Sequence, residues 1–162
     1  MRASAPGRET MPVGDFCRRS PCSAAPEESI REAAKRMDAR GVGCLVVVDG
    51  EGKPVGMLTD RDIVMRVLRR RRDPDATRVG EVIRGEVTRV REAAPLELAI
   101  RRMRSDGVRR IPVVDETGKL VGILAADDVL QLAASELAGV AALMRSQFPA
   151  DLEGGHALPA KG

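Results

Sequence analysis

The chain carries an internal repeat, and this feature limits its possible folds more than any other. Shifting the sequence by 66 positions aligns residues 13–62 with residues 79–128 without a gap, and 17 of the 50 aligned pairs are identical. Identical blocks recur at this spacing: Gly41-Val42 as Gly107-Val108, Val47-Val48-Asp49 as Val113-Val114-Asp115, and Val55-Gly56 as Val121-Gly122. Self-similarity at a fixed period indicates two copies of one structural unit.

The same order of elements is predicted for each copy. Apolar side chains recur at helical spacing over Ser29–Arg40 and again over Pro95–Asp106, and a glycine follows each segment as a typical helix stop. Two runs rich in β-branched residues follow each helix and flank a turn sequence, which predicts hairpins. These runs are Leu45–Val48, Val55–Leu58, Ile111–Val114 and Leu120–Leu124. With a short strand near Ser23 and Arg89, and a second helix from about Asp60 and Asp127, each unit reads β-α-β-β-α.

One unit of about 60 residues would bury only about 60% of its unfolded surface, so the two units are expected to pair. We predict an α+β fold in which they pack through their sheets about a pseudo-two-fold axis. The predicted boundaries are 12–72 for the first domain, 73–78 for a linker and 79–148 for the second, which ends in a long helix. That helix has a broad apolar face, which would pack against its own chain or against the second chain of a dimer. Residues 1–11 and 149–162 are predicted to be disordered tails.

Composition argues against several classes of function. The sequence has two Phe and neither Tyr nor Trp, so it lacks the stacked aromatics of single-strand nucleic-acid proteins. Its net charge of +3 gives no general attraction to polyanions. One histidine and three cysteines do not form a metal or disulfide pattern. With no apolar run of membrane length and no apolar leader, we expect a cytoplasmic protein that needs no metal, cofactor, membrane or nucleic acid.

Two motifs carry a family resemblance. The stretch Gly56-Met57-Leu58-Thr59-Asp60-Arg61-Asp62, after Leu45–Asp49, resembles the cystathionine-β-synthase (CBS) domain signature, and Arg109–Asp115 with Val121–Leu124 matches it again. The resemblance covers roughly residues 12–147 and implies a tandem CBS pair of the Bateman type. Such a pair is a regulatory module that binds adenosyl ligands in a central cleft, usually as a homodimer, and is not an enzyme.

The resemblance also implies a ligand and a role. We expect AMP, ADP or ATP, with S-adenosylmethionine or NAD as alternatives. Energy sensing would act through a ligand-dependent change of shape or assembly, read by an unknown target protein. The other candidate is a ligand-free structural module that dimerises or docks a partner. An enzyme ranks last, because no nucleophile–base pair or metal set can be named.

The main candidate site lies where the Leu58 strand meets the next helix. Backbone N–H groups at such a helix start form a potential anion site. Thr59 can add a hydroxyl donor, and Asp62 can accept from both ribose hydroxyls, the roles these positions have in the resembled family. The same spacing is close to that of a capping box, in which both side chains bind their own helix. Both interpretations stay open.

The second copy departs from this pattern. Ala125 replaces Thr59 and removes the hydroxyl, whereas Asp128 keeps the ribose acceptor. In the opening strand, the hydroxyl of Ser23 is replaced by Arg89. A lost neutral hydrogen bond costs about 0.5–1.5 kcal/mol. We therefore predict a stronger site in the first copy and a weaker or differently selective one in the second.

The remaining candidates are basic residues and thiols. Arg109 and Arg110 have no basic counterpart in the first copy; the resemblance implies that they reach ligand phosphates, and the alternative is that at least one faces solvent. The run Arg66–Arg72 is interpreted as helix-end arginines facing the helix dipole and water. The three thiols are interpreted as buried or idle, with redox sensing as the alternative: Cys17, Cys22 and Cys44.

Overall fold

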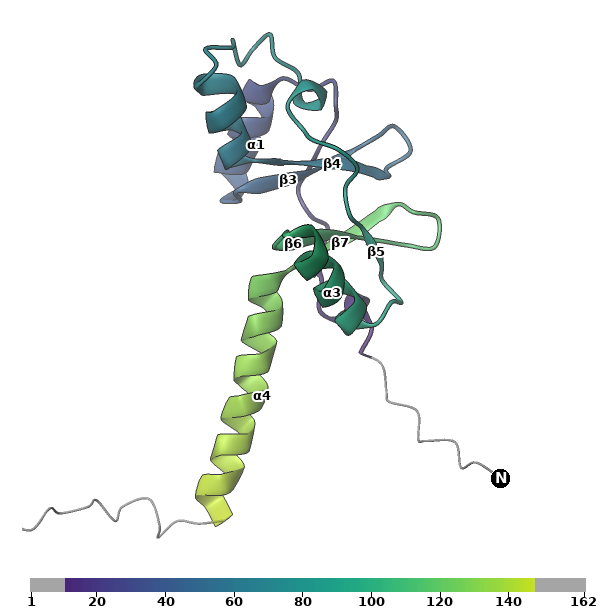
Figure 1. The fold of residues 1–162 in the computed structure, drawn as a ribbon, viewed down its shortest axis with the longest axis vertical. Helices are drawn as coiled ribbons and strands as arrows, with labels where there is room; N and C mark the ends of the chain where they lie inside the picture. The colour runs from purple at the N-terminus through teal and green to yellow at the C-terminus, as the bar shows by residue number, and fades with distance from the viewer. Residues whose placement is uncertain (1–10, 148–162) are drawn as a thin grey trace, which may run out of the picture. The chain divides into compact units, whose positions relative to one another are not determined.

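The computed structural model describes residues 11–147, which form two units (Figure 1). The first unit ends at Ala126 and holds the strands of both repeats, and the second begins at Asp127, within the last helix. Except for Met11, the predicted tails over residues 1–11 and 149–162 lie outside the described residues, as does Phe148. Within the described part of the chain, no helix combines the length and apolar character needed to cross a bilayer.

Each repeat has the predicted order of elements. The first contains β2 (Ser23–Ala24), α1 (Ile30–Arg40), β3 (Cys44–Val48), β4 (Pro54–Thr59), α2 (Asp60–Ile63) and a π-helical turn, η2 (Val64–Leu68). The second contains β5 (Val90–Arg91), α3 (Leu96–Asp106), β6 (Arg110–Val114), β7 (Leu120–Ala125) and α4 (Ala126–Gln147). Each repeat begins with a 3-10 turn, η1 (Val13–Asp15) and η3 (Val79–Glu81), and β1 (Arg18–Arg19) follows η1. The predicted α+β fold is confirmed.

The ends of α1 show why the sequence forms a helix there. The Ser29 hydroxyl accepts a hydrogen bond from the N–H of Glu32 at 3.2 Å, which caps one of the unpaired donors of the first turn. Gly41 ends the helix with a φ of +60°, a conformation that costs glycine little. Between these residues Ile30, Ala33 and Met37 are buried on one face. The α1 helix therefore packs its apolar stripe on the core of the first repeat.

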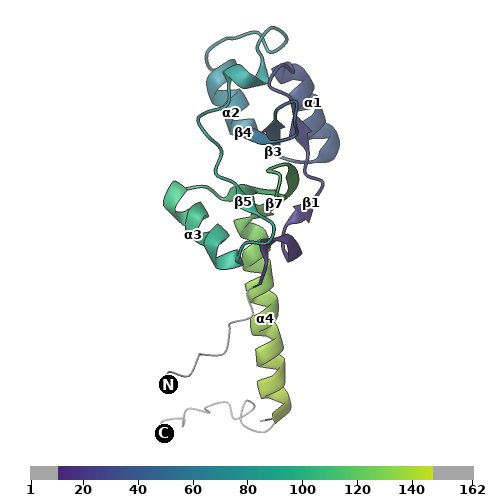
Figure 2. The same cartoon turned by 90° about the vertical axis from the view of Figure 1, so that its right-hand side faces the viewer.

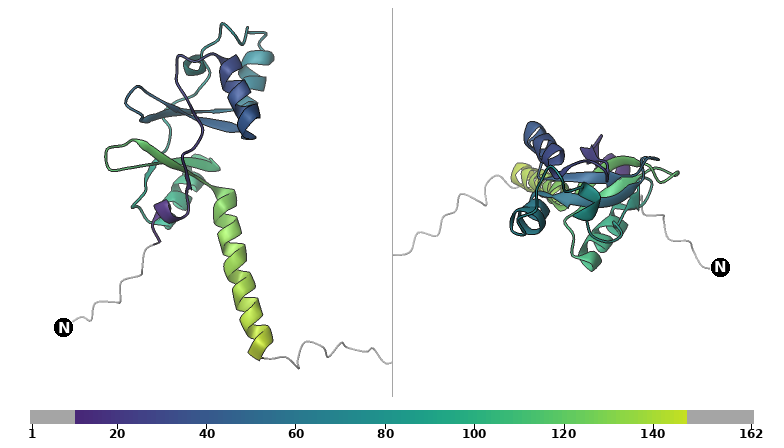
Figure 3. Two further views of the ribbon diagram at one scale, coloured as in Figure 1. Left: turned by 180° about the vertical axis from the view of Figure 1, so that it is seen from behind. Right: turned by 90° about the horizontal axis from the view of Figure 1, so that it is seen from above.

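Two sheets organise the first unit. One has the strand order β2-β3-β4, and the other has the order β1-β7-β6-β5. The hairpins have equivalent registers, with Leu45 opposite Leu58 and Ile111 opposite Leu124, and all four of these side chains are fully buried. The hairpin turns lie on the same side (Figure 3), where the N–H of Leu120 donates to the carbonyl of Gly52 at 2.9 Å. The repeats are thus hydrogen-bonded to each other within one unit.

The opening segments of the two repeats are exchanged between them. Strand β1 pairs with β7 of the second repeat (Figure 2), and the N–H of Val13 donates to the carbonyl of Ala94 at 2.9 Å. In the other direction, the N–H of Val79 donates to the carbonyl of Glu28 at 2.9 Å, and its side chain is buried in the core of the first repeat. This exchange carries residues 84–89 past the first repeat on the way to β5.

Candidate functional site

A cavity of about 450 Å³ lies beside α2 and is called here the Asp62 cavity. Its lining comes from both repeats and from the segment that connects them: Met57, Asp62, Arg66, Arg84, Glu86, Val87, Thr88, Asp106, Val108 and Arg110. Of the residues proposed from sequence, Asp62 and Arg110 are brought together here. Ligand pockets of a few hundred Å³ hold small molecules of nucleotide size.

Thr59 and Asp62 form the capping box that the sequence allowed. The N–H of Asp62 donates to the Thr59 hydroxyl at 3.1 Å, and the N–H of Thr59 donates to Oδ2 of Asp62 at 3.1 Å. The Thr59 hydroxyl also donates to Oδ2 at 2.6 Å. Thr59 therefore has its hydrogen-bonding capacity satisfied by its own helix and is not among the residues that line the cavity. Only Oδ1 of Asp62 lies outside this box.

The N–H groups at the start of α2, where an anion site is predicted, have hydrogen-bond partners within the protein. The N–H of Asp60 donates to the carbonyl of Gly43 at 3.1 Å, and the N–H of Arg61 donates to Oδ1 of Asp60 at 2.7 Å. Together with the Asp62 N–H, the first three donors of the helix therefore have partners. The side chains that surround the helix start are therefore the other candidates for holding an anion, and the helix-start site stays a prediction.

Arg66 is the nearest such side chain to Asp62. Its Nη2 lies 3.0 Å from Oδ1 of Asp62, one helical turn away, and its Nη1 donates to the carbonyl of Val82. The side chains of both Asp62 and Arg66 are about one-fifth exposed, at 20% and 19%. Arg66 therefore does not face only the helix dipole and water, as the sequence interpretation held.

Three arginines and three carboxylates meet around the cavity. The arginines are Arg66, Arg84 and Arg110, and the carboxylates are Asp62, Glu86 and Asp106. Asp106 also accepts hydrogen bonds from the hydroxyls of Thr88 and Ser105, and these bonds hold its pKa below the usual range. Its carboxylate is therefore committed to local partners. Arg110 extends from the start of β6, so a buried strand fixes its backbone.

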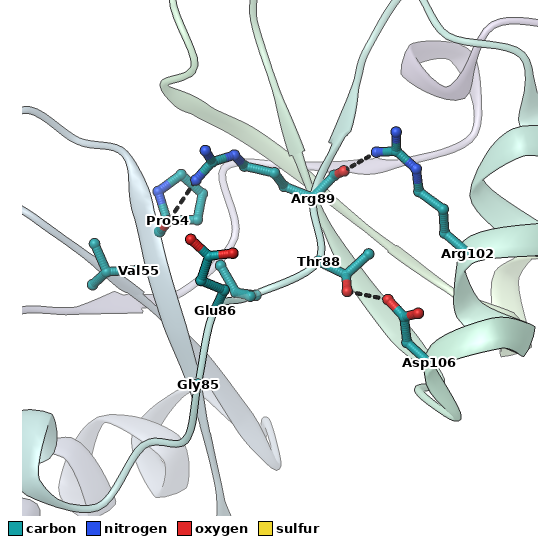
Figure 4. Close-up of a pocket in the computed structure, with 9 residues that line it drawn as sticks. Pro54, Val55, Gly85, Glu86, Thr88, Arg89, Arg102 and Asp106 are labelled. Carbon is teal, nitrogen blue, oxygen red and sulfur yellow. Dashed lines mark hydrogen bonds between the residues drawn. The ribbon is translucent and has the colours of Figure 1, made fainter.

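A second cavity of about 630 Å³ shares Glu86, Val87, Thr88 and Asp106 with the lining of the Asp62 cavity (Figure 4). Arg89 reaches across it so that its Nη1 lies 3.3 Å from the carbonyl oxygen of Pro54. Arg102 donates to the carbonyl of Arg89 at 2.5 Å. These bonds tie the connecting segment to both repeats. The residue that replaces Ser23 in the second copy is thus an inter-repeat tether.

The other proposed site residues lie elsewhere. Ser23 lines a separate cavity of about 620 Å³ in the first repeat, together with Arg36 and Arg40. Arg109 is exposed, and its carbonyl accepts from the N–H of Ala126 at 2.8 Å. Asp128 lies in the first turn of α4, in the second unit. The first unit therefore does not bring Ser23 or Arg109 to the Asp62 cavity.

Two of the three thiols, Cys17 and Cys44, do not have the character of reactive cysteines. Burial raises the pKa of Cys44, and the positive charge of Arg110 offsets this only in part. Burial likewise raises the pKa of Cys17. A raised pKa reduces the thiolate fraction at neutral pH, and the thiolate is the reactive form. These two environments favour the interpretation as idle thiols over redox sensing.

Sequence reasoning missed Arg66, Arg84 and Thr88. The i,i+4 spacing of Asp62 and Arg66 was a usable signal for an ion pair on one helix face. Arg84 and Thr88 carried no comparable signal, because their position depends on the exchange of segments between the repeats. That exchange is a long-range feature that local patterns do not encode.

The comparisons with known proteins agree with this architecture. The CBS domain family model matches residues 13–69 and 79–135, so the chain belongs to the CBS domain family and contains two such domains. Among curated relatives, the CBS domain-containing protein YhcV of Bacillus subtilis is 40% identical over 105 residues, which are 65% of this chain and 73% of YhcV. The matched segment spans 61% of the length of the relative MK0525 from Methanopyrus kandleri and 20% of the inosine-5′-monophosphate dehydrogenase of Methanocaldococcus jannaschii.

Two solved structures are similar over most of the chain. The CBS domain protein PAE2072 of Pyrobaculum aerophilum, complexed with AMP, is 27% identical with a TM-score of 0.67, over 76% of this chain and 99% of that one. The CBS domain pair of protein MJ0100, in complex with 5′-methylthioadenosine and S-adenosyl-L-methionine, is 27% identical with a TM-score of 0.69. That match covers 78% of this chain and 98% of the other. Both structures support the assignment to tandem CBS pairs.

Proposed function

We propose that the chain is a regulatory module that binds an adenine nucleotide, AMP, ADP or ATP, in the Asp62 cavity. The observation that carries the proposal is that Asp62 and three arginines line one cavity of nucleotide size, with Arg66 in contact with Oδ1 of Asp62. Asp62 would accept hydrogen bonds from the ribose hydroxyls, and Arg110 and Arg84 would donate hydrogen bonds to the phosphate. The AMP and S-adenosylmethionine complexes of the similar CBS pairs support an adenosyl ligand.

The adenine ring would lie against aliphatic side chains. The cavity offers Met57, Val87 and Val108 for this purpose, and the sequence contains neither Trp nor Tyr. Apolar contact gives affinity without discriminating among adenosyl compounds. Choice among AMP, ADP, ATP, S-adenosylmethionine and NAD would therefore depend on the charged residues near the phosphate.

Substitution of Arg110 tests the phosphate role. In Arg110→Ala, we expect AMP affinity to fall by about 10- to 100-fold, because a hydrogen bond to a charged group contributes about 1.5–3 kcal/mol. Adenosine, which has no phosphate, should bind as it does to the wild type. Titration calorimetry with both ligands measures the difference, and Arg104→Ala, an exposed arginine of α3, is the matched control. Equal AMP affinity in Arg110→Ala and wild type would remove Arg110 from the site.

A ligand-free structural module is the second candidate, and the capping box favours it. Every hydrogen bond of Thr59 is internal to its helix, and Oδ2 of Asp62 serves the same cap. In that case, replacement of Asp62 would lower stability by about 0.5–2 kcal/mol, as for other caps, and no adenosyl ligand would stabilise the chain. The two candidates therefore differ in ligand response.

Ligand binding would regulate a target by changing how copies of the chain assemble. The proposed homodimer surface is on α4. Leu130, Leu137 and Met144 are spaced by seven residues, with exposed fractions of 70%, 70% and 57%. Side chains at this spacing lie on one face of a helix, as in coiled coils. A second copy of the chain would cover this face, and ligand binding would shift the balance between assembled arrangements.

We expect sedimentation equilibrium to give about twice the mass of the 17.4 kDa chain. The Leu137→Glu variant should shift the protein to monomer, because a charge would be buried in the apolar seam. Ser135→Glu is the control, since it adds the same charge at another exposed position of α4. A monomeric wild type, or a Leu137→Glu dimer as tight as that of the control, contradicts the proposal.

A further inference from the structure

We propose that Arg66 determines specificity at the Asp62 cavity by making binding depend on a ligand phosphate. In this role Arg66 competes with ribose for Asp62 and becomes a phosphate donor once it leaves that carboxylate. The inference rests on the proposed function and adds to it the means by which a nucleotide is distinguished from an uncharged nucleoside.

The competition follows from the hydrogen bonds of Asp62. Oδ2 already accepts from the backbone and hydroxyl of Thr59, at 3.1 and 2.6 Å. Oδ1 is the atom left for ribose, and it is paired with Nη2 of Arg66 at 3.0 Å. A ribose diol that binds Asp62 must therefore share or displace the Arg66 contact. Separating a partly buried ion pair is unfavourable unless each charge gains another partner.

A phosphate supplies that partner, and a nucleoside does not. Arg66 lines the cavity and keeps a second anchor through Nη1 on the carbonyl of Val82. Its guanidinium can thus turn from Asp62 to a phosphate while its position stays fixed by that anchor. The planar fork of arginine suits phosphate oxygens. When adenosine binds, the displaced Arg66 guanidinium gains no new partner, because adenosine has no phosphate.

The charge balance of the cavity makes this exchange important. The three arginines of the lining are matched by three carboxylates, so the cavity carries no formal excess that would attract a phosphate by itself. Glu86 and Asp106 lie in the same lining as Arg84 and Arg110. When a ribose binds Asp62, it releases Arg66, whose positive charge then becomes available for a phosphate. Without a bound ribose, Arg66 stays paired with Asp62. Ribose and phosphate recognition become coupled in one ligand.

The local backbone and the comparison of the two repeats indicate that the exchange of Arg66 between Asp62 and phosphate is specific to the first copy. Arg66 lies in the π-helical turn Val64–Leu68, where the N–H of Arg69 donates to the carbonyl of Val64 at 2.9 Å. Such turns are uncommon and occur frequently at functional sites. The equivalent position in the second copy is Leu132, within the regular helix α4, and its side chain has no charge to compete for a carboxylate.

The test compares adenosine and AMP by titration calorimetry on the full chain and on Arg66→Ala. We expect the preference for AMP over adenosine to fall by about 10-fold or more in Arg66→Ala, with adenosine binding at least as tightly as to the wild type. Arg66→Lys, which keeps the charge without the fork, should retain an intermediate preference. Arg70→Ala, an exposed arginine just after the π-helical turn, should retain the full preference.

Three results overturn the inference. If Arg66→Ala weakens adenosine and AMP by the same factor, Arg66 acts only as a structural support for Val82. If the wild type binds both ligands and the preference is unchanged in Arg66→Ala, the inference fails while the proposed function stands. If the wild type binds neither adenosine nor AMP, the role of Arg66 fails, and the proposed function fails with it when ADP and ATP do not bind either.

Discussion

Asp62→Asn is expected to weaken adenine-nucleotide binding by about 100-fold or more. The substitution keeps the size of the side chain but removes the negatively charged carboxylate, which would accept hydrogen bonds from two ribose hydroxyls. Hydrogen bonds to a charged group contribute about 1.5–3 kcal/mol each, and about 1.4 kcal/mol corresponds to a tenfold change in affinity. Titration calorimetry with AMP measures the loss directly.

The matched control for this prediction is Asp60→Asn. Asp60 lies two residues earlier on α2, is exposed, and accepts a hydrogen bond from the N–H of Arg61. This control should bind AMP with unchanged affinity, so a general effect of charge near the helix start can be separated from the loss at Asp62. Because Asp62 also caps α2, unfolding of both variants in urea must be followed. Wild-type affinity in a folded Asp62→Asn protein would contradict the site assignment.

Leu58→Ala is expected to lower the free energy of unfolding by about 2–5 kcal/mol, the cost of a cavity in a packed core. Leu58 is fully buried at 0% exposure and lies opposite Leu45 in the β3–β4 hairpin. Val55→Ala, at a position of the same strand that is 36% exposed, should cost much less. Circular dichroism during urea unfolding is the suitable measurement, since the chain has no Trp or Tyr to report fluorescence.

Leu58 also connects the core to the proposed site. It directly precedes Thr59, the N-cap of α2, so its burial fixes where the helix that carries Asp62 begins. We therefore expect Leu58→Ala to weaken AMP binding as well as stability. Equal stability of Leu58→Ala and Val55→Ala would show that the hairpin is not packed as described.

Local patterns predicted most of the fold because they act over short distances. Gly41 and Gly107 end α1 and α3 with φ values of +60° and +64°, as their positions after the apolar helical segments indicated. The hairpins follow from pairs of β-branched runs that flank turn residues, and the fixed spacing of the repeat predicted the duplication. Each of these signals lies within a few residues of the structure that it specifies.

The site was predicted less completely because it depends on contacts distant in sequence. Asp62 and Arg110 were proposed separately, and nothing in the motifs showed that Arg84 and Thr88 would line the same cavity. Nor did the motifs show that the N–H groups at the start of α2, where an anion site is predicted, would bond to the side chains of Thr59 and Asp60 and to the carbonyl of Gly43. Spacing shows which groups can meet but not which partner each group takes.

The central claim is that an adenine nucleotide binds the Asp62 cavity, and a thermal melting panel tests it most directly. Thermal unfolding of nucleotide-free wild type and Asp62→Asn would be monitored by calorimetry in the presence of AMP, ADP, ATP, S-adenosylmethionine or NAD. A ligand at about 100 times its dissociation constant should stabilise the wild type by about 2.7 kcal/mol, which is a rise in melting temperature of roughly 5–10 °C. We predict this rise with at least one adenine nucleotide and its loss in Asp62→Asn. No rise with any of the five ligands in the folded wild type would contradict the claim and favour the ligand-free module.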